Sequence, residues 1–177
     1  TAVAERLDPE ETKALVDRAL DRLSREVVAH GGRVDKYIGD NVMAVFGAPV
    51  AYEDDPERAV RTGLAMQAAM AEINEEIAAR PSTEGVEFAL RVGINSGDVL
   101  AGRSGDQYTV IGDTVNKACR YCDGAKPGGI VLGRATHQIV QLHVPCDETR
   151  IATKHEGDLA AFIVKETLTT GSFDAIA

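Results

Sequence analysis

The sequence has no tryptophan, only three cysteines, and no uncharged stretch long enough to cross a membrane. A membrane-spanning helix needs roughly 18 or more consecutive apolar residues, so none is expected. Three cysteines exclude a fold built on disulfide bonds and favour a reducing, cytoplasmic setting. The chain also lacks a Walker A loop, a dinucleotide fingerprint, an HExxH motif and a Gly-x-Ser-x-Gly elbow. The enzyme classes that depend on those motifs are therefore excluded.

Positive charge is also scarce. The 177 residues include 19 Lys and Arg against 28 Asp and Glu, which gives a net charge of −9. Nucleic acids and anionic membranes bind basic faces, so we expect neither a nucleic-acid partner nor direct membrane contact. A small anion held by a few local cations remains compatible with this balance. The apolar share of 44% and charged share of 27% are typical of a globular chain, and we interpret residues 1–177 as one domain.

Two long helices are predicted from their end signals. The first opens at Asp8-Pro9, with an N-cap residue followed by proline, and ends at Gly31-Gly32. The second opens on the same chemistry at Asp55-Pro56 and stops before Pro81. A third helix is expected after Asp113.

Strands are predicted between the helices. Residues 34–38 and 42–46 flank a turn at Gly39-Asp40-Asn41 and form an antiparallel hairpin. Residues 86–94 alternate strictly between apolar and polar, which indicates a half-buried strand. A second hairpin is expected over residues 99–111, followed by further short strands near residues 131, 151 and 162.

The predicted fold class is α+β. The opening order of helix, strand, strand, helix, strand becomes the ferredoxin-like βαββαβ unit if one strand precedes it. The sequence as given contains no such first strand, so we expect the domain to be incomplete at its N-terminal side.

Two charged residues of the first hairpin are candidates for binding. Asp40 lies at its tip, where the sequence fits either an ordinary Asp-Asn turn or a rigidly placed carboxylate ligand. Lys36 lies two residues from both Val34 and Ile38, so in a regular strand it is expected on the same, apolar face of the hairpin. A lysine there needs a partner, which is either a ligand or solvent at a strand edge.

The third helix carries further candidates. Asn116 and Arg120 lie four residues apart and share one helix face. An arginine fork suits phosphate oxygens, although such a pair is also typical of a solvated face. Cys119 and Cys122 form a Cys-x-x-Cys within the helix rather than on a turn, which favours reduced thiols over a zinc site.

Four segments follow one another along the chain in a distinctive order. They are KYIGDNVMAVFG at 36–47, DDPERA at 54–59, LRVGINSG at 90–97 and YTVIGDTVN at 108–116. In this order they resemble the catalytic domain of class III nucleotidyl cyclases. The resemblance runs from Thr1 to about Glu166.

The resemblance implies an adenylate cyclase, a phosphorus–oxygen lyase that converts ATP to 3′,5′-cyclic AMP and pyrophosphate in intracellular signal transduction. Such domains work as homodimers with active sites at the subunit interface. Two Mg²⁺ or Mn²⁺ ions per site are held by two aspartates and clamp the attacking and leaving oxygens. The resemblance also implies a cytoplasmic domain to which regulatory domains can be attached.

The resemblance assigns roles residue by residue. Asp40 matches the second metal-binding aspartate, and Lys36 and Thr109 match the pair that reads the base. Asn116 matches the residue that orients the ribose, and Arg120 matches the arginine that stabilises charge growing on the α-phosphate.

The sequence departs from the family pattern near Lys154 and at its start. Lys154 falls near a phosphate-contacting lysine, but Lys154-His155-Glu156 is less basic than the family's segment. Thr1 matches the end of the phrase that carries the first metal-binding aspartate. We therefore expect that aspartate and its strand upstream of Thr1.

The base-reading pair can be tested against the chemistry of the purines. Lys36 only donates and the Thr109 hydroxyl can accept, which complements adenine N1 and the 6-amino group. Guanine is the reverse of adenine at both positions, with a donor at N1 and an acceptor at O6. Many family members carry aspartate in place of Thr109, and a hydroxyl is the weaker acceptor, so looser discrimination is expected here.

Two alternatives from other classes stay open at this point. One is a catalytically silent cyclase-like domain that dimerises or binds nucleotide for regulation. The other is RNA binding on a ferredoxin-like sheet, which the negative charge and the few aromatic residues disfavour.

Overall fold

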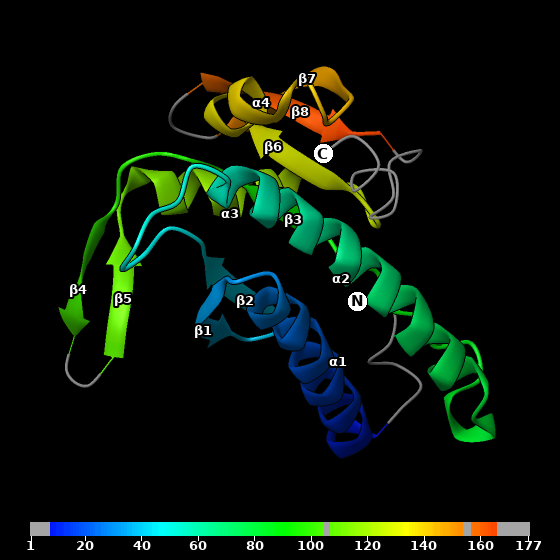
Figure 1. Ribbon diagram of the computed structural model, residues 1–177. Helices are drawn as coiled ribbons and strands as arrows, with labels where there is room; N and C mark the ends of the chain where they lie inside the picture. The colour runs from blue at the N-terminus through cyan, green and yellow to red at the C-terminus, as the bar shows by residue number, and fades with distance from the viewer. Residues whose placement is uncertain (1–7, 105–106, 154–156, 166–177) are drawn as a thin grey trace.

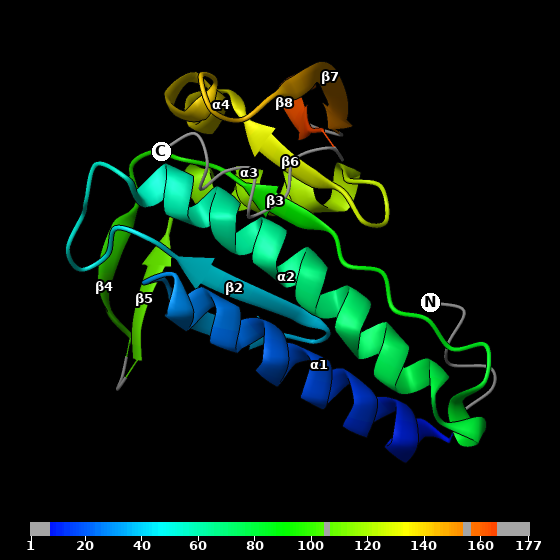
Figure 2. The same cartoon turned by 45° about the vertical axis from the view of Figure 1, so that its right-hand side comes forward.

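Two long helices run side by side through the fold (Figures 1 and 2). The computed structural model describes residues 8–104, 107–153 and 157–165. Helix α1 spans Pro9–Ala29, and the Asp8 carboxylate caps it by accepting from the Glu10 backbone N–H at 3.2 Å. Helix α2 spans Asp55–Ala78. Both helices begin within one residue of the predicted Asp-Pro pairs, but the N-cap of α2 is Asp54 rather than Asp55 and makes no side-chain capping bond.

The predicted first hairpin is present and lies next to α1. Strand β1, Arg33–Ile38, pairs antiparallel with β2, Asn41–Val45. Gly39 in the turn has a φ of +62°, a left-handed conformation that glycine adopts without steric cost. The turn places Asp40 at the exposed tip of the hairpin.

A β-bulge in β1 overturns the predicted orientation of Lys36. Val34 pairs with Ala44 and Lys36 pairs with Met43, so the register shifts at Asp35. Val34, Val42 and Ala44 pack toward the helices. A bulge adds one residue to a strand and breaks its two-residue alternation. Lys36 therefore lies on the face opposite Val34, and the expectation of an apolar surrounding for it was wrong.

The second predicted hairpin lies beside the first. Strand β4, Leu100–Ser104, pairs antiparallel with β5, Gln107–Ile111. Residues 105–106, between the two strands, lie outside the described residues. Strand β5 also contacts β1, so the two hairpins meet along these strands.

A four-stranded mixed sheet forms the remainder of the fold. Its order is β3-β6-β8-β7, with β3 and β6 parallel and the other pairs antiparallel. Its strands are β3 Val92–Ile94, β6 Ile130–Gly133, β7 Cys146–Thr153 and β8 Gly157–Val164. Helix α3, Asp113–Gly124, lies between β3 and β6 in the sequence, and α4, Arg134–Val140, lies between β6 and β7. A short 3₁₀ turn, Pro81–Thr83, follows α2. The architecture is α+β, as predicted.

The strand predicted over residues 86–94 is much shorter than expected, because only Val92–Ile94 forms β3. The Asn74 amide donates to the Phe88 carbonyl and accepts from the Phe88 N–H, both at 2.8 Å. Gln67 donates to the Leu90 carbonyl at 3.2 Å. Backbone groups satisfied by α2 side chains are not available to a strand ladder. The apolar alternation here reflects packing of Phe88 and Leu90 beneath α2.

Helix α2 is shared by two hydrophobic clusters that join the parts of the fold. One cluster packs α2 against the four-stranded sheet and α4 through Val60, Leu64, Ile130, Leu132, Val140, Val144, Phe162 and Val164. The other packs α2 against α1 and the first hairpin through Leu23, Val27, Met66, Ala69 and Met70. The placement of the hairpins relative to the sheet therefore depends on α2.

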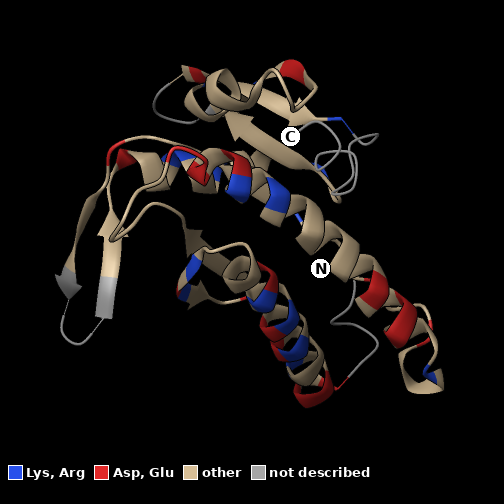
Figure 3. Ribbon diagram, in the orientation of Figure 1, with Lys and Arg blue, Asp and Glu red and all other residues tan. Residues whose placement is uncertain are grey.

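Charged residues are concentrated on the helices. Figure 3 shows acidic and basic residues interleaved along α1. They form ion pairs one turn apart, such as Arg25 with Asp21 at 2.5 Å. Exposed pairs of this kind contribute little to stability, so packing rather than charge holds α1 in place. Among the described residues no helix is both long and apolar enough to cross a bilayer.

Helix α3 packs directly on the backbone of β3 at Gly93. A Cβ atom there would lie 2.3 Å from the Cys122 nitrogen and 2.4 Å from the Ala118 carbonyl oxygen. Because these are helix backbone atoms, they cannot rotate away. We expect Gly93→Ala to lower the free energy of unfolding by about 3 kcal/mol, measured by denaturant titration.

Gly102→Ala on β4 is the matched control, because nothing lies within 4 Å of a Cβ at that position. It should leave the unfolding free energy within about 0.5 kcal/mol of the original. Equal values for the two variants would contradict the close approach of α3 to β3.

Candidate functional site

The two predicted base-reading residues come together where the hairpins meet. Lys36 lies on β1 and Thr109 on β5, far apart in the sequence. The Lys36 Nζ is 3.3 Å from Asp35 Oδ2, and the Thr109 Oγ1 is 2.7 Å from the same oxygen. The Lys36 ammonium and the Thr109 hydroxyl are thus held at one carboxylate oxygen, so two hydrogen-bonding groups lie next to each other.

Asp35 is a residue that the sequence interpretation missed. Its side chain is fully buried, at 0% exposure, whereas Lys36 is 38% exposed. Arg33 donates to its other oxygen, Oδ1, at 3.2 Å. The signal in the sequence was an acidic residue directly before the lysine in an apolar strand. Regular alternation predicts opposite faces for neighbours, so that signal indicated no shared site.

Asp40 stands apart from the base-reading pair, at the tip of the β1–β2 hairpin. It is exposed, and its Oδ1 accepts from Asn41 Nδ2 at 3.4 Å. Among the described residues, no cationic side chain forms an ion pair with Asp40. Its carboxylate is therefore open to a ligand from outside the hairpin.

Asn116 and Arg120 lie on α3, one turn apart as predicted. Asn116 is exposed and Arg120 is half-buried. Gly112, with a φ of +147°, links the end of β5 to the start of α3. This tight connection ties the position of Thr109 to that of the helix.

Contacts at both ends of α3 fix its place. The Thr114 hydroxyl donates to the Asp98 carbonyl at 2.7 Å, and Asn95 donates to the Thr114 carbonyl at 3.1 Å. At the other end, the Cys122 thiol contacts the Arg91 carbonyl at 3.3 Å. Asn116 and Arg120 are therefore presented on a helix anchored to the sheet rather than on a mobile loop.

The thiols of Cys122 on α3 and Cys146 on β7 are not primed for metal binding or nucleophilic chemistry. Burial raises the pKa of the Cys122 thiol, and the nearby Asp123 carboxylate adds to the rise. Burial also raises the pKa of Cys146, on β7, to about 11. Both thiols are protonated near neutral pH, and the thiolate is the reactive and metal-binding form.

A divalent cation at Asp40 fits the chemistry of that residue. Carboxylate oxygens are preferred ligands of Mg²⁺ and Mn²⁺. Within the described ranges no group of three or more His, Cys, Asp or Glu side chains gathers into a complete metal site. Mg²⁺ is commonly held by one or two carboxylates together with substrate phosphates and water. Asp40 suits that arrangement as one ligand. Lys154 and the expected upstream aspartate lie outside the described residues.

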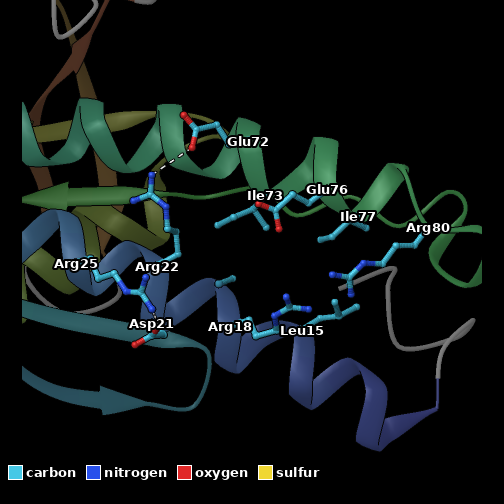
Figure 4. Close-up of a pocket in the computed structure, with 11 residues that line it drawn as sticks. Leu15, Arg18, Asp21, Arg22, Arg25, Glu72, Ile73, Glu76, Ile77 and Arg80 are labelled. Atoms are coloured by element: carbon cyan, nitrogen blue, oxygen red, sulfur yellow. Dashed lines mark hydrogen bonds and ion pairs between the residues drawn. The ribbon is translucent and has the colours of Figure 1, made fainter.

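The groove between α1 and α2 is separate from these residues (Figure 4). It has a volume of about 230 Å³. Its lining consists of Leu15, Arg18, Ala19, Asp21, Arg22, Arg25, Glu72, Ile73, Glu76, Ile77 and Arg80. Arg22 reaches across it to Glu72 at 3.2 Å. None of the predicted site residues lines this groove.

Comparison with known proteins gives a family match over most of the chain. The family model described as "Adenylate and Guanylate cyclase catalytic domain" matches residues 1–168. Adenylate cyclase 1 of Rhizobium meliloti (strain 1021) is 36% identical over 124 residues, which is 68% of this chain and 18% of that protein. The chain thus spans about a fifth of the length of this curated relative.

Solved structures agree with the family match. The adenylyl cyclase CyaB from P. aeruginosa superimposes with a TM-score of 0.84 at 28% identity, covering 94% of this chain and 88% of the other. The guanylyl cyclase Cya2 superimposes with a TM-score of 0.82 at 27% identity, covering 94% and 87%. Similarity of this kind does not separate the two substrate specificities, so any distinction must come from individual side chains.

Proposed function

The chain belongs to the adenylate and guanylate cyclase catalytic domain family, and from this premise we propose that it converts ATP to 3′,5′-cyclic AMP and pyrophosphate. The supporting observation is the meeting of Lys36 and Thr109 at one carboxylate. A donor beside an acceptor matches N1 and the 6-amino group of adenine. Guanine presents a donor at N1 and an acceptor at O6, so it would face like groups at both positions.

The reaction requires the ribose 3′-oxygen to attack the α-phosphorus in line with the leaving pyrophosphate. The new O3′–P bond closes the ring as the bond to the β-phosphate oxygen breaks, and the proton lost from the 3′-hydroxyl passes to solvent. Asn116 orients the ribose, and Arg120 donates to α-phosphate oxygens as negative charge builds on them. A lysine at position 154 is proposed to contact the phosphates. Asp40 would hold a divalent ion, which would supply Lewis-acid stabilisation of the developing charge.

The site is proposed to form between two copies of the chain. Each of the two sites takes Lys36, Thr109, Asn116 and Arg120 from one copy and Asp40 from the other copy. Three large apolar side chains on the hairpins are exposed, namely Ile38, Leu100 and Ile111, at 55%, 70% and 57%. Exposed apolar side chains on neighbouring hairpins favour an interaction surface. A homodimer would cover them.

The substrate assignment is tested by reversing the polarity of the base-reading pair. The original protein should prefer ATP to GTP in kcat/KM. Lys36→Glu combined with Thr109→Cys should shift that preference toward GTP by roughly tenfold or more, because a mispaired buried polar group costs about 1–3 kcal/mol. Glutamate can accept from the guanine N1 and amino protons.

Lys13→Glu is the matched control for the charge change, because Lys13 is an exposed residue of α1 paired with Asp17. It should leave the ATP to GTP ratio unchanged. A GTP preference in the original protein would overturn the assignment of Lys36 and Thr109. Absence of turnover with either nucleotide in the full-length protein would favour a silent regulatory domain.

A further inference from the structure

The carboxylate of Asp35 is buried between the two residues proposed to read the base. Its side chain is 0% exposed and holds Arg33 on one oxygen and both Lys36 and Thr109 on the other. The Thr109 bond joins the two hairpins side chain to side chain. A fully buried charge is costly unless it is paired and hydrogen-bonded, and these contacts supply that pairing.

The β-bulge in β1 is what brings Asp35 to this position. In a regular strand Asp35 and Lys36 would point to opposite faces of the hairpin. The register shift between Val34 and Lys36 places the extra residue at Asp35. Bulges commonly re-aim a side chain next to a functional site. Here the bulge allows two neighbouring residues to share one face.

The Asp35–Thr109 bond fixes which hydrogen-bonding group Thr109 presents. An ionised carboxylate only accepts, so at 2.7 Å the hydroxyl must donate to Asp35 Oδ2. A hydroxyl has one proton and two lone pairs. With its proton committed to Asp35, Thr109 offers only lone pairs to a third group.

We propose that Asp35 is a positioning residue that makes the Thr109 hydroxyl an obligatory acceptor and so sets base selectivity. This inference rests on the proposed cyclase function. An acceptor suits the 6-amino group of adenine and opposes O6 of guanine. A hydroxyl that donates to a carboxylate is also a stronger acceptor through hydrogen-bond cooperativity. Asp35 thereby makes the Thr109 hydroxyl a stronger acceptor, closer to the carboxylate that an aspartate at position 109 would provide.

The same carboxylate holds the other half of the pair. Lys36 Nζ forms an ion pair with Asp35 Oδ2 at 3.3 Å and can donate its protons to a ligand. Because Lys36 cannot accept, its selectivity does not depend on Asp35. Loss of Asp35 should therefore act on base selection chiefly through the Thr109 hydroxyl.

The test compares Asp35→Asn with the original protein in kcat/KM for ATP and for GTP, using the full-length protein. An amide can donate to Thr109 and release the hydroxyl to donate to guanine O6. We expect the ATP to GTP ratio to fall roughly tenfold, as a rise in KM for ATP with kcat largely retained. Asp147→Asn on β7 is the control, because Asp147 is exposed and pairs with Lys165 at 3.2 Å.

A double-mutant cycle separates this role from a merely structural link between the hairpins. Thr109→Val keeps the shape of the side chain and removes the hydroxyl. In that background Asp35→Asn should no longer change the ratio, because the hydroxyl it controls is gone. Asp35→Ser provides a second neutral variant, with the same expected fall, in case Asp35→Asn does not fold.

Each outcome bears on one claim. An ATP-preferring protein whose ratio is unaffected by Asp35→Asn or Asp35→Ser would overturn the role of Asp35 and leave the proposed function standing. An equal fall in the Thr109→Val background would also overturn it, because the effect would then not pass through the hydroxyl. No turnover of either nucleotide by the original protein would overturn the proposed function itself.

Discussion

Arg120→Ala is expected to lower kcat for ATP on the order of 10²-fold while leaving KM nearly unchanged. The reason is that the proposed bond is made to charge that appears on the α-phosphate only in the transition state. Arg120 is half-buried on α3, which packs on β3 at Gly93 and is held to the segment after β3 by the bond from Thr114 to Asp98. A donor held on an anchored helix needs little reorganisation when that charge forms.

Lys117→Ala is the matched control for Arg120. It removes a cation from the same helix, and Lys117 pairs with Asp113 at 2.6 Å, one turn before it. Its kcat should stay close to the original. Steady-state kinetics with ATP distinguishes the cases. An Arg120→Ala variant with unchanged kcat and a raised KM would make Arg120 a ground-state phosphate anchor instead.

Asp40→Ala is expected to lower kcat/KM for ATP roughly 10²-fold or more, since Lewis-acid stabilisation by bound metal supplies several kcal/mol. Asp40 is exposed at a hairpin tip, so its removal should not lower the midpoint of thermal unfolding. The variant should also need more Mn²⁺ for half-maximal activity. Turnover is measured across a Mn²⁺ titration.

Asn41→Ala is the control for Asp40, because it alters the same turn and keeps the carboxylate. It should retain most of the activity. Full activity of Asp40→Ala at ordinary Mn²⁺ concentrations would contradict a metal-binding role for this residue. Loss of activity together with a large fall in the unfolding midpoint would show a structural role instead.

Much of the fold could be predicted because its signals are local. The Asp-Pro pairs at Asp8 and Asp55 define the starts of both long helices, and the Gly39-Asp40 turn defines the first hairpin. These signals depend on capping and turn chemistry within a few residues. They remain valid whatever the helices and strands pack against.

The predictions that failed depended on partners distant in the sequence. Residues 86–91 alternate like a strand, yet Asn74 and Gln67 of α2 take up backbone groups of Phe88 and Leu90. The predicted face of Lys36 was wrong because a bulge has no distinct composition that marks it in the sequence. Both errors come from tertiary contacts that override a regular local pattern.

The site itself was only partly accessible from the sequence. The separation of Lys36 and Thr109 along the chain says nothing of their proximity, and their pairing came from the family resemblance. Asp35 could be predicted neither from the strand pattern nor from the family resemblance, because neither alternation nor the matched motifs single it out. Its role emerges only from the distances at its carboxylate.

The central claim is that two copies of this chain build each active site together, with Asp40 from one and Arg120 from the other. Mixing Asp40→Ala and Arg120→Ala chains tests this most directly. In a mixed dimer one of the two sites keeps both residues. Random pairing makes about half of the dimers mixed, so about a quarter of the original cyclic AMP production should return. Activity no greater than the sum of the two variants, in a verified mixed dimer, would contradict the shared site.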